Sequence, residues 1–444
     1  MSLVDAFDLL LVLYLGLTLV SLARLRAATL VVAANQLPPL RALSHAAEFG
    51  QPRSQSFLPA SVYSQDNLTI AAALFVVQLV LLAVCVFWPE PRKQVAAQRE
   101  LPAVPLWLRW VLAAYFVAVT LSSRTIITHH YIDPERLLFG LNLSGFHALL
   151  ASLALYELVR RVRLRILKPL TAFLLLFGLF FATDYLKGST GLASGFLVTG
   201  ALLFVREEPA RARRWLFLSA AAVTAVLLAL AVRGLRNTLY SQGFEAVSGF
   251  TRALGAQEGS VARDAEGLEI SGNGVQYAAH VLECISLYEA GISRQWRSIY
   301  RPLEYTFKPS FLVEPLGLER PREAAWELGD YYVGGGGTFV LGELYWNGGY
   351  PCLLIVLSAI FWFCWRCDTG ARSSGLWLLL LCEFAPNVLQ GIGYGFAQTS
   401  RGALNGALVL GVRWAWLRLT ARRGGAAPPA EQKPPPARPR TEPA

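Results

Sequence analysis

The sequence predicts an all-α, polytopic integral membrane protein with about ten transmembrane helices and one large loop outside the membrane. Of its 444 residues, 54% are hydrophobic and only 16% are charged, whereas a soluble domain averages about 25% charged residues. The apolar residues also fall in runs of about twenty, the length needed to cross a bilayer core. Unpaired backbone groups cannot face lipid, so each run should be a helix. A soluble enzyme, a disordered chain and a fibrous repeat are excluded.

The apolar runs define the expected elements and divide the chain into four parts. The predicted spans are residues 7–23, 68–88, 106–123, 137–158, 169–186, 190–205, 215–232, 337–363, 375–396 and 401–419. They form a seven-helix membrane bundle in 1–232, a large loop in 233–336 and a three-helix bundle in 337–420, followed by a proline-rich tail in 421–444. We expect the tail to be disordered and cytoplasmic. No clear cleavage site follows the first run, so that run should be retained.

Lysine and arginine gather after every second predicted span, which sets the expected orientation. The clusters fall in segments 89–109, 159–168, 206–214, 366–372 and 422–423. The positive-inside rule places these segments in the cytoplasm. Both termini are then cytoplasmic, and segments 24–66 and 233–336 lie outside the membrane on the far side. Arg24 and Arg26 do not fit the positive-inside rule, because they follow a span whose end is placed on the outer side.

The large loop contains one further apolar stretch, from Val275 to Gly291. It predicts a helix that lies on the membrane or packs on the bundle. An eleventh span would be costly, because His280, Glu283 and Glu289 would enter the bilayer.

Cysteine and charge usage limit the possible chemistry. Of the six cysteines, Cys284 lies in the loop and the others lie in or beside apolar runs, so we expect buried thiols rather than a disulfide framework. The net charge of +10 would suit nucleic acid in a soluble protein, but here it lies between the apolar runs. We therefore expect no nucleic-acid partner, and the lipid bilayer is the surface that this charge meets.

Two predicted spans carry polar residues at helical spacing. The eighth contains Glu343, Asn347 and Tyr350, and the ninth contains Glu383, Asn387, Gln390 and Tyr394. Spacing of i, i+4 and i+7 puts each set on one helix face. Two polar stripes on neighbouring helices predict a hydrated cavity between them, with Glu343 as the leading functional candidate, because an ionisable residue within the membrane is costly. Hydrogen bonding between helices is the competing interpretation.

A second group of candidates is basic and lies on the predicted outer side. Its members are Arg301, Lys308, Arg401, Arg233 and Arg236. The planar guanidinium matches phosphate oxygens and lysine adds a point charge, so the group suits a lipid-linked phosphate or diphosphate. Anchoring to lipid headgroups or loop salt bridges competes with this role, most strongly for Arg233, Arg236 and Arg401. Prolines fix the backbone next to Arg301 and Lys308. No metal-ligand set is evident, and we expect no cofactor.

Two stretches resemble motifs of a known family. Residues 299–311, IYRPLEYTFKPSF, are similar to the basic proline motif of Wzy-type oligosaccharide repeat-unit polymerases. Residues 337–355, GTFVLGELYWNGGYPCLLI, resemble the glycine-rich entry to that family's next helix. The order Arg301-Pro302 replaces Pro-Arg, and Gly348-Gly349 stands where Phe-Gly is usual.

The resemblance implies a transferase of the bacterial inner membrane with a GT-C-like architecture. It would join undecaprenyl-diphosphate-linked oligosaccharide repeats into O-antigen, capsule or exopolysaccharide at the periplasmic face. Arg301 and Lys308, with Arg401, would bind the diphosphate and stabilise its developing charge. Glu343 would accept the proton of the attacking hydroxyl as general base, with Glu383 in reserve. The resemblance requires no metal.

Three other functions remain open. An O-antigen ligase-type transferase uses the same kind of lipid-linked donor. A flippase or transporter of lipid-linked sugars is a second alternative, although the chain lacks the internal repeat that many transporters have. The third is a structural partner in a polysaccharide export complex. If the protein is a polymerase, a chain-length regulator is a candidate partner.

Overall fold

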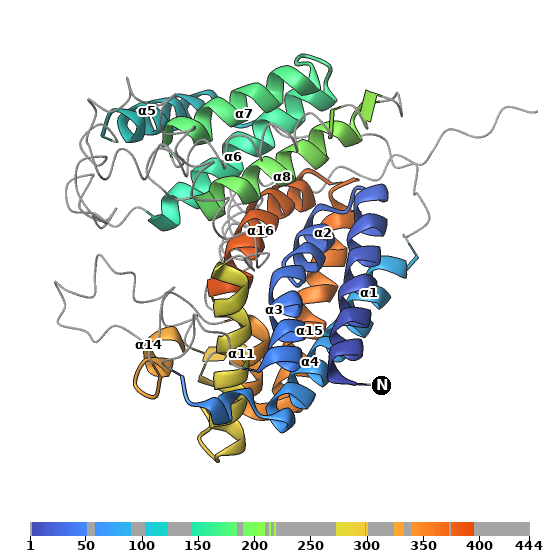
Figure 1. The fold of residues 1–444 in the computed structure, drawn as a ribbon. Helices are drawn as coiled ribbons and strands as arrows, with labels where there is room; N and C mark the ends of the chain where they lie inside the picture. The colour runs from blue at the N-terminus through green and yellow to red at the C-terminus, as the bar shows by residue number, and fades with distance from the viewer. Residues whose placement is uncertain are drawn as a thin grey trace, which may run out of the picture.

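The computed structural model describes the chain in twelve segments. They are residues 2–50, 58–89, 103–122, 144–183, 190–208, 213–214, 217–218, 272–297, 299–300, 324–332, 339–372 and 374–394. The regular structure in these segments is helical, as the sequence predicts (Figure 1). Helices occupy eight of the predicted apolar runs. The seventh and tenth predicted spans, 215–232 and 401–419, lie almost entirely outside the described residues.

Three helices are long and apolar enough to cross a membrane: α1 (Leu3–Ala23), α4 (Gln65–Phe87) and α15 (Val340–Gly370). Shorter apolar stretches fill much of four others: α5 (Leu106–Ser122), α7 (Pro169–Thr183), α8 (Thr190–Arg206) and α16 (Gly375–Tyr394). The remaining predicted span is α6 (Ser144–Arg163), whose last turn carries three arginines. The described chain is therefore an all-helical assembly with three candidate membrane-spanning helices.

Helices α1 and α4 run in the same direction. The Tyr14 hydroxyl donates to the Phe75 carbonyl and to Gln78 Oε1, both at 2.9 Å. Ten residues further along α1, the Arg24 guanidinium donates to the Val86 carbonyl at 2.6 Å, near the end of α4. The sequence analysis alternates the direction of successive spans, so that α1 and α4 would be antiparallel. That prediction is wrong.

Two helices that the sequence analysis missed reverse the chain between α1 and α4. Helix α2 (Ala27–Ala34) has seven of its eight residues buried, and α3 (Leu37–Phe49) follows with prolines in its first turn. The Ser44 hydroxyl on α3 donates to Asp8 Oδ1 at 2.6 Å, so α3 ends near the start of α1. The described part of segment 24–66 is thus largely helical and packed in the core, whereas the sequence analysis expects an extramembrane connection. Each helix alone is too short to predict a span.

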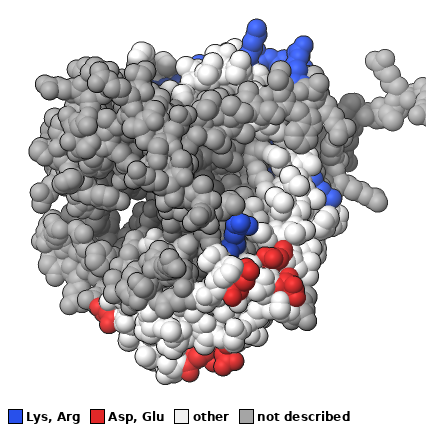
Figure 2. All heavy atoms as spheres, viewed as in Figure 1, with Lys and Arg blue, Asp and Glu red and all other residues white. Residues whose placement is uncertain are grey.

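Basic residues collect at one end of the bundle, which we call the basic end and define by Arg24, Arg26, Arg163, Arg206 and Arg372. The Arg26 guanidinium donates to the Cys85 carbonyl at 2.6 Å, and Arg163 pairs with Glu207 at 2.9 Å. Arg206 lies within electrostatic range of Arg163 and Arg372. Figure 2 shows basic side chains on the upper edge of the visible face and acidic side chains in its lower half, with one further basic side chain next to the acidic ones.

The N-terminus lies at the end opposite the basic end, because α1 starts there and finishes at Arg24. The acidic residues Asp5 and Asp8 mark this opposite end. With the basic end in the cytoplasm, the N-terminus would lie on the other side, whereas the sequence analysis expects both termini to be cytoplasmic. The C-terminal tail lies outside the described residues.

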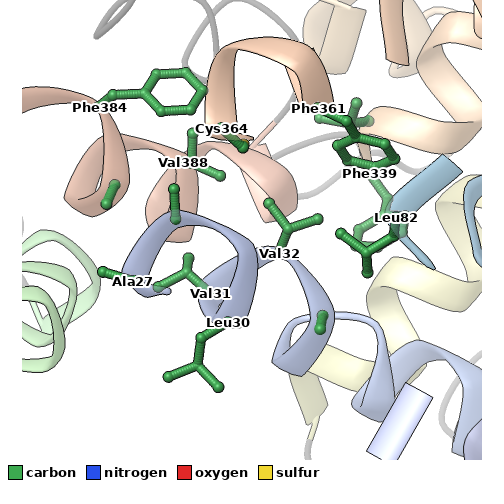
Figure 3. Packing of buried hydrophobic residues seen from close by; sticks show 14 of the residues in the cluster. Ala27, Leu30, Val31, Val32, Leu82, Phe339, Phe361, Cys364, Phe384 and Val388 are labelled. Atoms are coloured by element: carbon green, nitrogen blue, oxygen red, sulfur yellow. The ribbon is translucent and has the colours of Figure 1, made fainter. Parts of the chain in front are cut away.

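Helix α16 connects the two groups of helices that Figure 1 shows, since it packs against α2, α6, α8 and α15. A glycine permits its close approach to α8: a Cβ on Gly195 would lie 2.7 Å from the Pro386 carbonyl oxygen. In the core around α2, Val32 lies near Val388 of α16 and Phe361 of α15 (Figure 3). All six cysteines are free and buried, which confirms that prediction.

Helix α15 is broken at two glycines rather than continuous. Gly348 and Gly349 have non-helical backbone angles, and Gly349 has φ of +64°. Phe339 and Phe361 line one small cavity although 22 positions separate them (Figure 3), and a straight helix would hold them about 33 Å apart. Residues 340–347, which we call the half-helix, therefore fold back against residues 350–370. We call residues 350–370 the crossing segment. The single span predicted over 337–363 is wrong in this respect.

The apolar stretch in the predicted loop forms α11 (Gly272–Glu289), and it packs on the bundle against α3, α4 and α15. It also contacts the short 3₁₀ helix η2 (Ala60–Tyr63). The half-helix lies along α11 at close range, because a Cβ on Gly342 would be 2.8 Å from the Val281 Cα. Part of the predicted external loop is therefore built into the helical core.

Candidate functional site

A buried arginine joins three separate segments of the chain. Arg294 follows α11 and is 3% exposed. Its Nε donates to Glu327 Oε2 at 2.7 Å, and its Nη1 donates to Glu343 Oε1 at 3.3 Å. Glu327 belongs to α14 (Ala324–Leu328), and Glu343 belongs to the half-helix. We call these three residues the Arg294 cluster.

The backbone around Arg294 is fixed by the C-terminal end of the half-helix. The Arg294 N–H donates to the Trp346 carbonyl at 3.1 Å, and the Trp296 N–H donates to the Asn347 carbonyl at 3.0 Å. In return, the Trp346 indole N–H donates to the Ile292 carbonyl at 2.7 Å. A helix that ends inside a protein needs partners for its last carbonyls, and segment 292–296 supplies two of them.

The Trp346 ring covers one side of the guanidinium, with the Arg294 carbon 5.3 Å from the ring centroid. A cation above an aromatic face is stabilised further when water is excluded. Burial opposes the charged form of Arg294, but the hydrogen bond with Glu327 and the charges of Glu343 and Glu327 outweigh it and raise the pKa of Arg294. Arg294 therefore stays charged.

Two carboxylates share this one guanidinium, at 2.7 Å and 3.3 Å. Two like charges close together in a buried setting are costly without such a cation. Arg294 therefore holds the Glu343 carboxylate in a fixed position on the half-helix.

The structure brings Glu343 and Asn347 onto one face, as the sequence predicts. The Asn347 side-chain amide donates to the Glu343 carbonyl at 2.6 Å, one turn back. Tyr350 does not continue this stripe, since it follows the break at Gly348 and Gly349 and is partly exposed.

The first two members of the second predicted stripe, Glu383 and Asn387 on α16, are bonded to each other. Glu383 and Asn387 are both buried, and the Asn387 amide donates to the Glu383 carbonyl at 2.6 Å and to Glu383 Oε1 at 3.4 Å. The side chains of Gln390 and Tyr394 lie outside the described residues. The small cavity between α15 and α16 has a volume of about 10 Å³, at the lower limit for one water. Its lining is mostly apolar, so it is not the hydrated cavity that the stripes predict.

The predicted phosphate-binding residues Arg301, Lys308, Arg401, Arg233 and Arg236 all lie outside the described residues. Arg301 follows Tyr300 directly in the chain, and the Ile299 N–H donates to the Trp296 carbonyl at 2.9 Å beside the Arg294 cluster. The stretch 299–311 therefore begins five residues after Arg294 in the chain.

Exposed aromatic side chains surround this part of the molecule. They are Trp296, Tyr300, Tyr331 and Tyr350, each more than a third exposed. Tyr331 packs edge-on against Trp346, and the Tyr345 hydroxyl donates to Glu289 Oε1 at 2.8 Å beside Tyr350. Large apolar rings with a hydroxyl or N–H at one end can contact ligands that are themselves partly apolar and partly polar.

Sequence reasoning missed Arg294 and Glu327. Both lie in the large predicted loop among many other charged residues, and no helical spacing relates them to Glu343. No protein-family model, curated protein or solved structure matches the chain.

Proposed function

We propose that this protein is a membrane transferase that polymerises undecaprenyl-diphosphate-linked oligosaccharide repeats, as the Wzy-type polymerases do. The observation that supports this most is the Arg294 cluster, a buried set of one arginine and two carboxylates built around a half-helix that ends inside the bundle. The half-helix belongs to the second stretch that resembles the family. The first stretch starts beside the cluster, at Ile299.

The proposed reaction needs a proton acceptor and a diphosphate-binding group. Glu343 accepts the proton of the attacking sugar hydroxyl, and Arg294 and Glu327 hold its carboxylate in place. Arg301 and Lys308, with Arg401, bind the diphosphate of the donor and stabilise the charge that develops as it leaves. Arg233 and Arg236 add positive charge at the lipid headgroups.

The positive-inside rule gives the proposed orientation. It places the basic end in the cytoplasm. The crossing segment starts at Tyr350 and reaches Asp368 near the basic end. Along a straight helix, Tyr350 and Asp368 are about 27 Å apart. The Arg294 cluster then lies toward the periplasmic side of a bacterial inner membrane, in a multi-pass GT-C-like bundle.

The test compares a deletion strain with strains carrying single variants, by gel analysis of surface polysaccharide and of lipid-linked intermediates. Arg301→Ala, Lys308→Ala and Glu343→Gln should each shorten the polymer strongly at unchanged protein level. Single repeat units should accumulate on the carrier in the deletion strain. Normal polymer length in all three variants would remove the proposed roles of these residues.

Two alternatives give different intermediates in the same experiment. An O-antigen ligase-type transferase would leave full-length polymer on its lipid carrier. A flippase is favoured by one observation, the broken helix α15, because transporters often bind substrate at discontinuous helices. Its loss would leave single lipid-linked repeats that enzymes added outside the cell cannot reach.

A further inference from the structure

A second group of buried polar side chains lies on another face of α11. Tyr63 Oη, His280 Nδ1 and Glu283 Oε2 are each fully enclosed and have no hydrogen-bond partner among the described residues. The three side chains are 8%, 4% and 2% exposed. We call this group the Glu283 cluster.

The topology brings the three residues together. His280 and Glu283 are spaced i, i+3 on α11, so they are neighbours on the helix surface. Tyr63 ends η2, which packs against α11, and it lies within electrostatic range of Glu283. The half-helix occupies a different side of α11, where Gly342 meets Val281 and Cys284.

Burial without a partner determines the form that Glu283 can take. An ionised carboxylate loses its hydration inside a protein and is strongly disfavoured unless an opposite charge compensates. Glu283 Oε2 has no hydrogen-bond partner among the described residues. Arg294, the buried cation at the other end of this region, is already engaged by Glu327 and Glu343.

Other titratable groups on the elements packed around α11 do not compensate this burial. Arg41, His45 and Glu48 on α3 and Asp66 on α4 are exposed, so they point away from the enclosed cluster. On α11 the titratable groups include the Cys284 thiol next to Glu283 in the chain, and on α15 they include Glu343, which is held by Arg294, and the Cys352 thiol. Neither thiol supplies a positive charge.

We propose that Glu283, with His280 and Tyr63 beside it, is a proton-binding site inside the helical bundle. In this step the Glu283 carboxylate combines with a proton to give the neutral acid, and no other bond forms or breaks. The three unpartnered atoms are fully enclosed, so the ligand is a proton, or one water that carries it, and not a sugar. This site is separate from the Arg294 cluster and does not depend on the proposed polymerase activity.

The test is carbodiimide labelling of the purified full-length protein in detergent, read by peptide mass spectrometry across a pH series. The apolar probe dicyclohexylcarbodiimide reacts with protonated carboxyls in apolar surroundings. The acid proton passes to a carbodiimide nitrogen, the carboxyl oxygen bonds to the carbodiimide carbon, and the adduct rearranges to a stable acylurea. At neutral pH we expect Glu283 to be labelled, because its enclosed carboxyl binds a proton there.

Variants separate the proposal from general reactivity. Glu283→Gln should remove the label, whereas Glu48→Gln, which changes an exposed carboxyl on α3, should leave it unchanged. Labelling should fall as the pH is raised in the unmodified protein, and this measurement decides the question even if Glu283→Gln does not fold. Absence of label on Glu283 at neutral pH, or labelling of Glu283 that does not change with pH, would overturn the proposal.

Discussion

Asp368 Oδ2 accepts two hydrogen bonds from Thr29, one from its backbone N–H at 3.1 Å and one from its hydroxyl at 2.7 Å. The other carboxylate oxygen accepts from the Ala28 N–H at 3.1 Å. These groups lie in the first turn of α2, which has no side-chain cap of its own at Arg26. A carboxylate from α15 therefore caps α2 at its N-terminus, where the helix dipole favours negative charge.

Replacing Asp368 with alanine should destabilise the bundle at the basic end. The substitution removes three hydrogen bonds and leaves buried N–H groups of α2 without an acceptor, so we expect the free energy of unfolding to fall by about 2 kcal/mol or more. Thermal unfolding in detergent measures this. Glu48→Ala, at an exposed position on α3, is the control and should have no comparable effect. Equal stability of the two variants would show that Asp368 does not cap α2.

The Arg294 cluster should respond unequally to loss of its members. Arg294→Ala removes the cation that bonds to both buried carboxylates, so we expect the free energy of unfolding to fall by about 3–5 kcal/mol. Glu343→Gln leaves Arg294 paired with Glu327 and should cost much less. In the double variant Arg294→Ala/Glu343→Gln, the loss of unfolding free energy should be smaller than the sum of the two single losses by about 0.5–3 kcal/mol, because the residues are in contact. Additive losses would mean that the 3.3 Å contact carries no coupling.

Hydropathy alone predicts the long helices well and the short ones poorly. Helices α1 and α4 are continuous apolar runs that begin and end close to the predicted residues. Helix α2 is more completely buried than either, but its eight residues are followed by Asn35, Gln36 and two prolines, which are typical of a loop. Because α2 and α3 were not predicted, the expected direction of α1 was the reverse of the observed one. The positions of Arg24 and Arg26, which did not fit the positive-inside rule, indicated that error.

The candidate site was predictable only in part for a similar reason. Glu343 and Asn347 could be found because their spacing lies within one helix. Arg294 and Glu327 meet Glu343 through tertiary packing of three segments, and no pattern in the sequence connects them. The break after Asn347 had a visible signal in the glycine pair, but only the positive φ of Gly349 shows that the chain turns back there.

Gly349→Ala should disrupt this break. A Cβ at Gly349 would lie 2.6 Å from the Tyr288 hydroxyl, and φ of +64° is unfavourable for alanine. We expect a loss of about 1–3 kcal/mol in unfolding free energy, since strain of this kind costs that much. Gly178→Ala is a matched control, because a Cβ there meets nothing within 4 Å and alanine favours the helix. An unchanged melting temperature for Gly349→Ala would show that the turn tolerates a side chain.

The direction of α1 predicts which side of the membrane each end of the bundle faces. Because all six native cysteines are buried, a membrane-impermeant maleimide applied to intact cells should report only on introduced, exposed cysteines. Ser2→Cys and Asp66→Cys lie at the end opposite the basic end and should both be labelled from outside. Lys168→Cys, which follows the arginine-rich end of α6, should be labelled only after the cells are permeabilised.

The three cysteine variants together decide between two topologies. With the positive-inside rule fixing the basic end in the cytoplasm, the bond between Arg24 and the Val86 carbonyl requires α1 to start on the outer side. Ser2 and Asp66 must then behave alike, because α1 and α4 both begin at that end. Labelling of Asp66→Cys from outside, with Ser2→Cys protected until permeabilisation, would instead place α1 antiparallel to α4 and contradict the packing of Tyr14 against Phe75.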